Sequence, residues 1–176
     1  MSLLKEINEK LALLSLKLKL AIPINLPVVL MLELTNRCNL KCPLCPTGTG
    51  QLKFKKTDMA FQQFKKIIDE LRSYIKRIYF EGFGEPLLCG DVFQIIGYSK
   101  KLKIKTEMAT NGTILNTENV AKKLVLSGLD TIRISLDGAT EMTLRKYRIG
   151  ANIIDILEGI EKLIITKSSI PQRFRK

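Results

Sequence analysis

The strongest constraint on the fold is an alternation of short apolar runs and amphipathic helical segments, which occurs four times along the chain. The strand-like runs cover residues 28–34, 77–81, 104–110 and 131–136. Each run is followed by a loop and then by apolar residues at helical spacing, in segments that begin near residues 58, 91, 116 and 141. Repeated strand–loop–helix units predict a parallel sheet with right-handed crossovers, so we expect an α/β fold with an open or barrel-like sheet.

Polar residues and glycines between these segments mark where the helices begin and end. We expect Asp58 and Asn116 to cap the first and third of these helices, because their side-chain oxygens can accept from free backbone N–H groups. Asp91 starts the second helix, and Gly128 stops the third, since glycine readily adopts the left-handed conformation at a helix end. Helical spacing is strongest over residues 153–165.

The chain divides into three parts. Residues 1–26 are an N-terminal amphipathic helix and a connector, residues 27–166 hold the strand–helix units, and residues 167–176 are a basic tail. The N-terminal helix carries a narrow apolar stripe of Leu4, Ile7, Leu11, Leu14 and Leu18. We expect this helix to pack beside the domain, and the alternative is a helix that binds a membrane surface or a partner, helped by its lysines.

Composition limits the chemistry that is available. The 176 residues suit one domain, and no stretch reaches the roughly 20 apolar residues that a membrane span needs. The absence of His excludes a Ser-His-Asp triad, a Cys-His pair and the His-Glu-x-x-His zinc motif. The start of the chain lacks a signal-peptide pattern, so we expect a cytoplasmic protein whose four cysteines serve a metal or catalysis rather than disulfides.

The charge balance suggests one further class of function. Lys and Arg number 29 against 17 Asp and Glu, which gives a net charge of +12. Basic surfaces attract phosphate, so a nucleic-acid-binding module is an alternative. Aromatic residues make up only 6% of the chain, the basic residues are spread along it, and no nucleic-acid motif is recognisable. These features argue against a nucleic-acid partner.

Three cysteines, Cys38, Cys42 and Cys45, stand in the spacing Cys-x-x-x-Cys-x-x-Cys on the loop after the first strand. Three thiolates within eight residues can hold one face of an iron–sulfur cube and leave one iron open to a substrate or cofactor. Residues 34–57 contain no Asp or Glu but five basic residues, and we expect this positive loop to lower thiol pKa and favour a cluster. A zinc site with Cys89 as fourth ligand is the alternative, although zinc loops usually use paired Cys-x-x-Cys spacings. We expect Cys89 to be a plain buried thiol.

The sequence around these cysteines, Glu-Leu-Thr-Asn-Arg-Cys-Asn-Leu-Lys-Cys-Pro-Leu-Cys over residues 33–45, resembles the cluster loop of radical S-adenosylmethionine (radical SAM) enzymes. Gly-Phe-Gly-Glu-Pro over residues 82–86 and Ser-Leu-Asp-Gly over residues 135–138 follow in the order found in that superfamily. The resemblance covers about residues 28–166. It implies that the three cysteines hold a 4Fe–4S cluster whose open iron binds S-adenosylmethionine. Reductive cleavage of S-adenosylmethionine would give a 5′-deoxyadenosyl radical, which would abstract hydrogen from a substrate.

The resemblance also implies which residues meet S-adenosylmethionine. The cofactor-binding candidates are Gly82, Gly84, Glu85, Asn111, Ser135 and Arg148. The glycine turn offers backbone carbonyls and a carboxylate that suit the methionine ammonium group, and Arg148 resembles an arginine that some members use against the methionine carboxylate. We expect Glu85 and Ser135 to contact the cofactor rather than hold the fold, whereas we expect Asn111 to form a turn, with contact to the cofactor as its alternative. No residue is assigned as catalytic.

One expectation rests on burial rather than on the resemblance. Arg133 shares a strand face with the candidate serine, while Glu33, Glu81 and Glu107 stand near the ends of the first three strands. A charge on a buried strand is costly unless it is paired. We therefore expect Arg133 to meet one or more of these glutamates inside the barrel, below the cofactor. The alternative is that some of the glutamates face solvent at a strand edge.

Radical SAM barrels typically have six strand–helix units, and this chain supplies four. The resemblance therefore implies a partial (β/α) barrel, most similar to the N-terminal part of the peptide-modifying branch, which usually carries a C-terminal auxiliary-cluster domain. We expect a fragment, a truncated gene or one half of an assembly, with the strand at 131–136 open to self-association or to a separate C-terminal half. Other expected partners are a peptide or small-molecule substrate and an electron donor such as flavodoxin or ferredoxin. A non-catalytic fragment or assembly partner is the remaining alternative.

Overall fold

The computed structural model describes residues 3–117 and 119–170. It contains one parallel sheet in the order β1–β2–β3–β4. The strands are β1 (Val29–Leu32), β2 (Arg77–Phe80), β3 (Lys105–Thr110) and β4 (Thr131–Ile134). The helices are α1 (Leu3–Lys17), α2 (Phe61–Leu71), α3 (Val92–Lys101), α4 (Val120–Ser127), α5 (Glu141–Tyr147) and α6 (Ile153–Ser169), with a 3-10 turn η1 (Pro86–Leu88). The α/β fold class and its four parallel strand–helix units are therefore confirmed.

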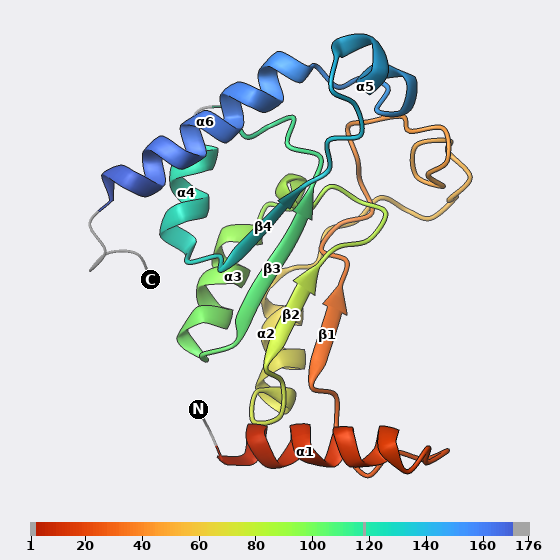
Figure 1. The fold of residues 1–176 in the computed structure, drawn as a ribbon, viewed down its shortest axis with the longest axis vertical. Coiled ribbons are helices and arrows are strands. Elements are labelled where there is room, and N and C mark those ends of the chain that lie inside the picture. Colours follow the sequence, from red (N-terminus) through yellow and green to blue (C-terminus); the bar gives the residue numbers. More distant parts are fainter. Residues whose placement is uncertain (1–2, 118, 171–176) are drawn as a thin grey trace.

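Helices α2, α3 and α4 cover one face of the sheet, and the opposite face is open (Figure 1). The core between the sheet and these helices includes Phe64, Ile68, Ile78, Phe80, Ile95 and Met108. Because side chains alternate along a strand, the residues between the core positions point to the open face. Tyr79, Glu107 and Arg133 lie there, at the concave side that a closed barrel would enclose.

Helix α1 lies across the amino-terminal ends of the strands (Figure 1). It packs beside the domain as expected, but not through its apolar stripe. Its buried residues are the polar Lys5, Asn8 and Ser15, whereas Ile7 and Leu14 are more than 40% exposed. The segments that these side chains meet, after α3 and before β1, present backbone carbonyl oxygens, and these bind polar side chains better than leucines.

Two of the predicted helix caps are wrong. Helix α2 begins at Phe61, beyond Asp58, because the Asp58 carboxylate accepts from Arg37 and Thr35 instead. The Phe61 N–H donates to Asp91 Oδ2 at 2.8 Å. Asp91 is thus the N-cap residue of α3 and also the acceptor for the first N–H group of α2. Asn116 lies ahead of α4, which starts at Val120, and its amide donates to Asp155 Oδ1 at 3.3 Å.

Other boundaries follow the expectations more closely. Gly128 ends α4 with φ of 84°, in the left-handed region that favours glycine. Helix α6 continues to Ser169, so the first residues assigned to the basic tail are helical, and residues 171–176 lie outside the described residues. None of the helices in the described part of the chain has the length and hydropathy needed to span a bilayer.

Candidate active site

The loops at the carboxyl ends of the strands surround a cavity of about 280 Å³. All nine residues that the sequence nominates for the site line this cavity: Cys38, Cys42, Cys45, Gly82, Gly84, Glu85, Asn111, Ser135 and Arg148. Much of the remaining wall is formed by Phe83, Ala109, Thr110 and Tyr147. Residues far apart in the sequence thus meet at the edge of the sheet where parallel α/β folds build their binding sites.

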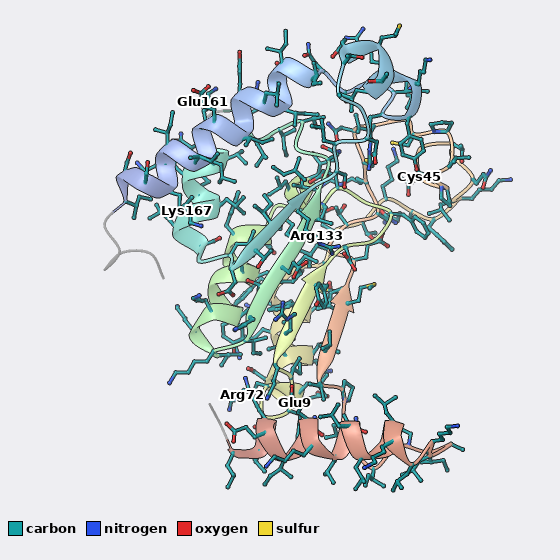
Figure 2. All side chains as sticks on the ribbon, in the orientation of Figure 1. Glu9, Cys45, Arg72, Arg133, Glu161 and Lys167 are labelled. Atoms are coloured by element: carbon teal, nitrogen blue, oxygen red, sulfur yellow. The ribbon has the colours of Figure 1, made fainter. Side chains whose placement is uncertain are left out.

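The three cysteines lie on the loop that follows β1, and Figure 2 shows Cys45 on this loop, beyond the ends of the strands. The N–H of Lys41 donates to Ile149 O at 2.9 Å, which ties the loop to the segment between α5 and α6. The N–H of Cys45 donates to Cys42 O at 3.2 Å and forms a turn. A Cβ atom on Gly48 would lie 2.5 Å from Cys42 O, so the chain can fold back over the cysteines only because residue 48 is glycine.

Two side chains direct N–H groups toward the cysteine sulfurs. Asn111 Nδ2 lies 3.9 Å from Cys38 Sγ, and Arg148 Nη1 lies 3.9 Å from Cys42 Sγ. Donors at this distance stabilise negative charge on sulfur, which thiolate ligands of an iron–sulfur cluster carry. The cavity wall therefore supplies charge compensation to two of the three thiols.

The basic loop does not act on the Cys38 thiol in the expected way. Burial raises the pKa of the Cys38 thiol above its ordinary value, so the expectation of a lowered thiol pKa is wrong for this residue. The neighbouring Arg37 is turned away from the cavity, because its guanidinium binds the Asp58 carboxylate and donates to Leu88 O at 2.7 Å. Arg37 thus fixes the cysteine loop to the domain, and its positive charge is paired with Asp58 rather than directed toward the cavity.

The turn of Gly82, Phe83 and Gly84 is held by Glu33, the residue after β1. Glu33 Oε1 accepts from the Phe83 N–H at 2.5 Å and from the Gly84 N–H at 3.0 Å. A Cβ atom on Gly84 would lie 1.7 Å from Thr35 O, so only glycine fits against the start of the cysteine loop. Glu33 is thus not among the glutamates that Arg133 meets, because its carboxylate is used by this turn. Sequence reasoning missed this role.

Glu85 lines the cavity, but its carboxylate is engaged within the chain. It is 2% exposed. Its Oε1 accepts from Thr110 Oγ1 at 2.7 Å and from the Leu87 N–H at 3.2 Å, and its Oε2 accepts from the Asn111 N–H at 2.8 Å. Burial raises the pKa of this carboxyl above its usual range. Glu85 joins the end of β2 to the end of β3, and direct contact with a cofactor stays a prediction.

Asn111 belongs to a second network that sequence reasoning did not find. Its Nδ2 donates to Asn39 Oδ1 at 2.9 Å, and its Oδ1 accepts from the Thr113 N–H at 3.0 Å. Asn39 Nδ2 in turn donates to Thr113 Oγ1 at 2.7 Å. This closed set of hydrogen bonds fastens the cysteine loop to the segment after β3, so Asn111 both turns the chain and faces the cavity.

Arg148 and Ser135 complete the wall on the side of β4. The Arg148 guanidinium forms an ion pair with Asp137, and its plane lies 5.4 Å from the centre of the Tyr147 ring. Burial is the largest single influence and lowers the pKa of Arg148, but the hydrogen bond and charge of Asp137, together with the Cys42 sulfur, leave that pKa raised. The Ser135 N–H donates to Thr110 O at 2.9 Å, which extends the β3–β4 pairing into the site.

The open face of the sheet below the cavity carries a network of charges (Figure 2). Arg133 Nε lies 2.7 Å from Glu107 Oε1, and Arg133 also pairs with Glu81. Arg77 Nη1 lies 3.3 Å from Glu107 Oε2, and both arginines approach the Tyr79 ring, at 5.8 and 6.0 Å. The expected pairing of Arg133 is confirmed for two of the three glutamates.

Cys89 stands apart from the cavity. It is 2% exposed, and its sulfur lies 3.6 Å from Met59 O. Among residues 3–117 and 119–170, no three Cys, Asp, Glu or His side chains come together as ligands of a single metal ion. The three cavity thiols border one space, and N–H donors point at two of them, so this donor set fits an iron–sulfur cluster better than a zinc ion with Cys89 as fourth ligand.

Comparison with known proteins agrees with this geometry. The profile of the radical SAM superfamily matches residues 32–166. The chain is 37% identical over 134 residues to a probable GTP 3′,8-cyclase of Methanococcus maripaludis, covering 76% of this chain. It is 33% identical over 148 residues to the AdoMet-dependent heme synthase of Methanosarcina barkeri, covering 84% of this chain.

Solved structures share the fold. SuiB of Streptococcus suis bound to the precursor peptide SuiA superposes with a TM-score of 0.69 at 19% identity, over 91% of this chain and 35% of that one. The chain spans less than half of the cyclase and the heme synthase, 44% and 41% of their lengths. The family match nevertheless begins at the last residue of β1 and includes the cysteine loop and strands β2, β3 and β4. The chain therefore belongs to the radical SAM superfamily, whose members bind a 4Fe–4S cluster and S-adenosylmethionine.

Proposed function

We propose that this chain binds a 4Fe–4S cluster through Cys38, Cys42 and Cys45 and cleaves S-adenosylmethionine reductively. The observation that carries the proposal is that these three thiols and six candidate cofactor residues line one cavity. When bound, the cluster supplies the single electron that cleaves S-adenosylmethionine to methionine and a 5′-deoxyadenosyl radical, the agent of hydrogen abstraction.

The chain's own residues bind and orient the cofactor. Glu33 engages the amides of the glycine turn, which leaves the turn's carbonyl groups as acceptors for the methionine ammonium. Arg148 presents a cation on the cavity wall and Ser135 a hydroxyl, which suit the methionine carboxylate and the ribose.

The proposal extends to the class of substrate and to the partners of the chain. The SuiB–SuiA neighbour supports a peptide substrate, while the cyclase and the heme synthase support a small molecule. An electron donor such as flavodoxin or ferredoxin, in a reducing cytoplasm, would supply the electron. None of the three relatives has the name of a nucleic-acid-binding protein, so that alternative gains no support.

The free edge of the sheet is where further structure would dock. Within the described residues, β4 pairs with β3 alone. Beside it runs a groove of about 560 Å³ between α4, β4 and α6, lined by apolar residues that include Ile132, Leu163 and Ile164. A further strand–helix segment, or another copy of the chain, would cover both the edge and the groove. We expect sustained turnover to require such a segment.

Anaerobic reconstitution with iron and sulfide tests the proposal. Single Cys→Ala variants at positions 38, 42 and 45 should lose iron and the brown absorption of the cluster, whereas the matched variant Cys89→Ala should keep both. With dithionite and S-adenosylmethionine, the reconstituted chain should release 5′-deoxyadenosine, and with no partner added a monomer should not turn over repeatedly. Retention of iron in Cys42→Ala together with its loss in Cys89→Ala would overturn the assignment.

A further inference from the structure

Helix α1 is fixed to the domain by polar side chains. Lys5 Nζ donates to the carbonyl oxygens of Leu102 and Lys103, both at 3.4 Å, at the end of α3. Asn8 Nδ2 donates to Leu26 O at 3.0 Å, and Asn8 Oδ1 accepts from the Leu26 N–H at 2.9 Å. Both anchoring side chains are 5% exposed. Their hydrogen bonds define which side of the helix faces the domain.

Two further contacts prevent the helix from rolling about its axis. Glu9 forms an ion pair with Lys76, the residue before β2. Ser15 Oγ accepts from the Ile24 N–H at 3.2 Å, which binds the end of the helix to the connector. Turning the leucines inward would break these contacts and leave buried polar groups without partners. The orientation is therefore a property of the fold.

The outward side of α1 and the start of the connector carry an exposed apolar row, which we call the outer stripe. It consists of Leu3, Ile7, Leu14 and Leu18, whose exposed fractions lie between 42% and 70%. Ile22, at 83%, continues the apolar surface along the connector. Leu13 and Leu16, at 62% and 75%, add exposed apolar surface elsewhere on the helix. Exposed apolar side chains gathered on one element mark an interaction site on a folded protein.

Lysines border the outer stripe. Lys10 and Lys17 lie beside it on α1, Lys19 follows the helix, and all three are exposed. Of the two acids on the helix, Glu9 is turned toward Lys76, and Glu6 lies in the first turn, so the three lysines outnumber the acid on this side. An apolar row edged by lysines is complementary to a surface with an apolar interior and an anionic boundary, and an anionic lipid leaflet has this composition.

We propose that α1 docks the protein on an anionic membrane surface through the outer stripe and its lysines. The helix has 15 residues and would lie flat along about 22 Å of the interface. It sits at the end of the sheet opposite the cavity, so a docked chain keeps its cysteine loop away from the bilayer (Figure 1). Pairing of two copies through the stripe is disfavoured, because it would bring lysines of both copies together.

Vesicle flotation of the whole chain tests the proposal. The chain should bind vesicles of phosphatidylcholine mixed with phosphatidylglycerol at least tenfold better than pure phosphatidylcholine vesicles, because three lysines each add attraction to an anionic surface. High salt should reduce that difference. The triple variant I7Q/L14Q/L18Q should lose at least tenfold of the binding, and so should K10Q/K17Q/K19Q on the mixed vesicles.

Matched variants test whether vesicle binding depends on this surface or on exposed apolar residues and lysines anywhere in the chain. I154Q/L157Q/I165Q removes three exposed apolar residues of α6, and K53Q/K55Q/K56Q removes three exposed lysines of the cysteine loop. Both should keep wild-type binding. Equal losses in these variants would overturn the proposal, as would full binding by I7Q/L14Q/L18Q. A wild-type dimer that this variant converts to a monomer, with no vesicle binding by either, would show that a second copy occupies the stripe instead.

Discussion

The carboxylate of Glu33 accepts a hydrogen bond from the Gly84 N–H at 3.0 Å, and this contact joins the ends of the first two strands across the cavity wall. The amides of this turn are thereby satisfied, and the turn itself lines the cavity. The acceptors proposed for a methionine ammonium are therefore set by an acid on the neighbouring strand end. Glu33 is a positioning residue for the turn.

Replacing Glu33 by Ala should weaken S-adenosylmethionine binding by about 1–2 kcal/mol, because the turn loses the acceptor that orients it. The effect should appear as a raised dissociation constant in calorimetry of the reconstituted protein. Since Glu33 is exposed, the free energy of unfolding should change little. Glu161→Ala removes an equally exposed acid on α6 and should leave binding unchanged. Normal binding by Glu33→Ala would contradict the positioning role.

Gly84→Ala should destabilise the fold. The new Cβ atom would lie 1.7 Å from Thr35 O, so the backbone must shift, and a cost of about 3 kcal/mol is expected from overpacking of this kind. Gly90→Ala is the matched change on the same connection, because a Cβ atom at Gly90 meets nothing within 4 Å. Urea unfolding of the two variants measures the difference. Equal stability would show that the turn can relax.

The fold and the residues that line the candidate site could be predicted from the sequence, because both follow from local sequence patterns. Apolar runs at the strand positions specify the sheet, and the motifs at the strand ends meet because parallel strands share one edge. The partners of individual side chains were less predictable. Asp58 has the sequence signature of a helix cap, but its carboxylate accepts hydrogen bonds from Arg37 and Thr35 instead of from the helix.

Helix α1 shows the same limit. Its heptad-like leucines predict an apolar contact, and the contact is polar because the segment after α3 and the connector before β1 offer carbonyl oxygens to Lys5 and Asn8. Spacing identifies a face of a helix but not what that face meets. The ion pairing of Arg133 was predicted correctly because Glu81 and Glu107 lie on the same face of the sheet, within reach of its guanidinium. Glu33 instead accepts a hydrogen bond from the Gly84 N–H.

Arg133→Met should remove the cation between Glu81 and Glu107. The Glu107 side chain is only 13% exposed, so the two acids lose a shared partner and the free energy of unfolding should fall by about 1 kcal/mol at low salt. High salt should shrink the loss by screening the remaining repulsion. In the Arg133→Met background, Glu81→Gln should recover part of the stability. Arg145→Met, in an exposed pair on α5, should cost less, and an equal cost would contradict the network.

Glu85 should make stability depend on pH. Burial raises its folded-state pKa above the ordinary 4.5, so the folded chain binds this proton more tightly than the unfolded chain does. The stabilising contribution of the protonated group is complete below pH 4.5 and is lost as pH rises through the folded-state pKa. Glu85→Gln is neutral throughout, so wild type should lose stability relative to it over that window.

Urea unfolding of the chain without iron, across that window, measures the difference between wild type and Glu85→Gln. Glu158→Gln, which changes an exposed acid on α6, should run parallel to wild type. If Glu85→Gln also runs parallel, the carboxyl titrates normally and the burial argument fails. Glu85→Ala separates the two roles considered for this residue. Because three donors would lose their acceptor, it should unfold more easily even without cofactor, whereas a residue that only contacts S-adenosylmethionine would leave the cofactor-free stability unchanged.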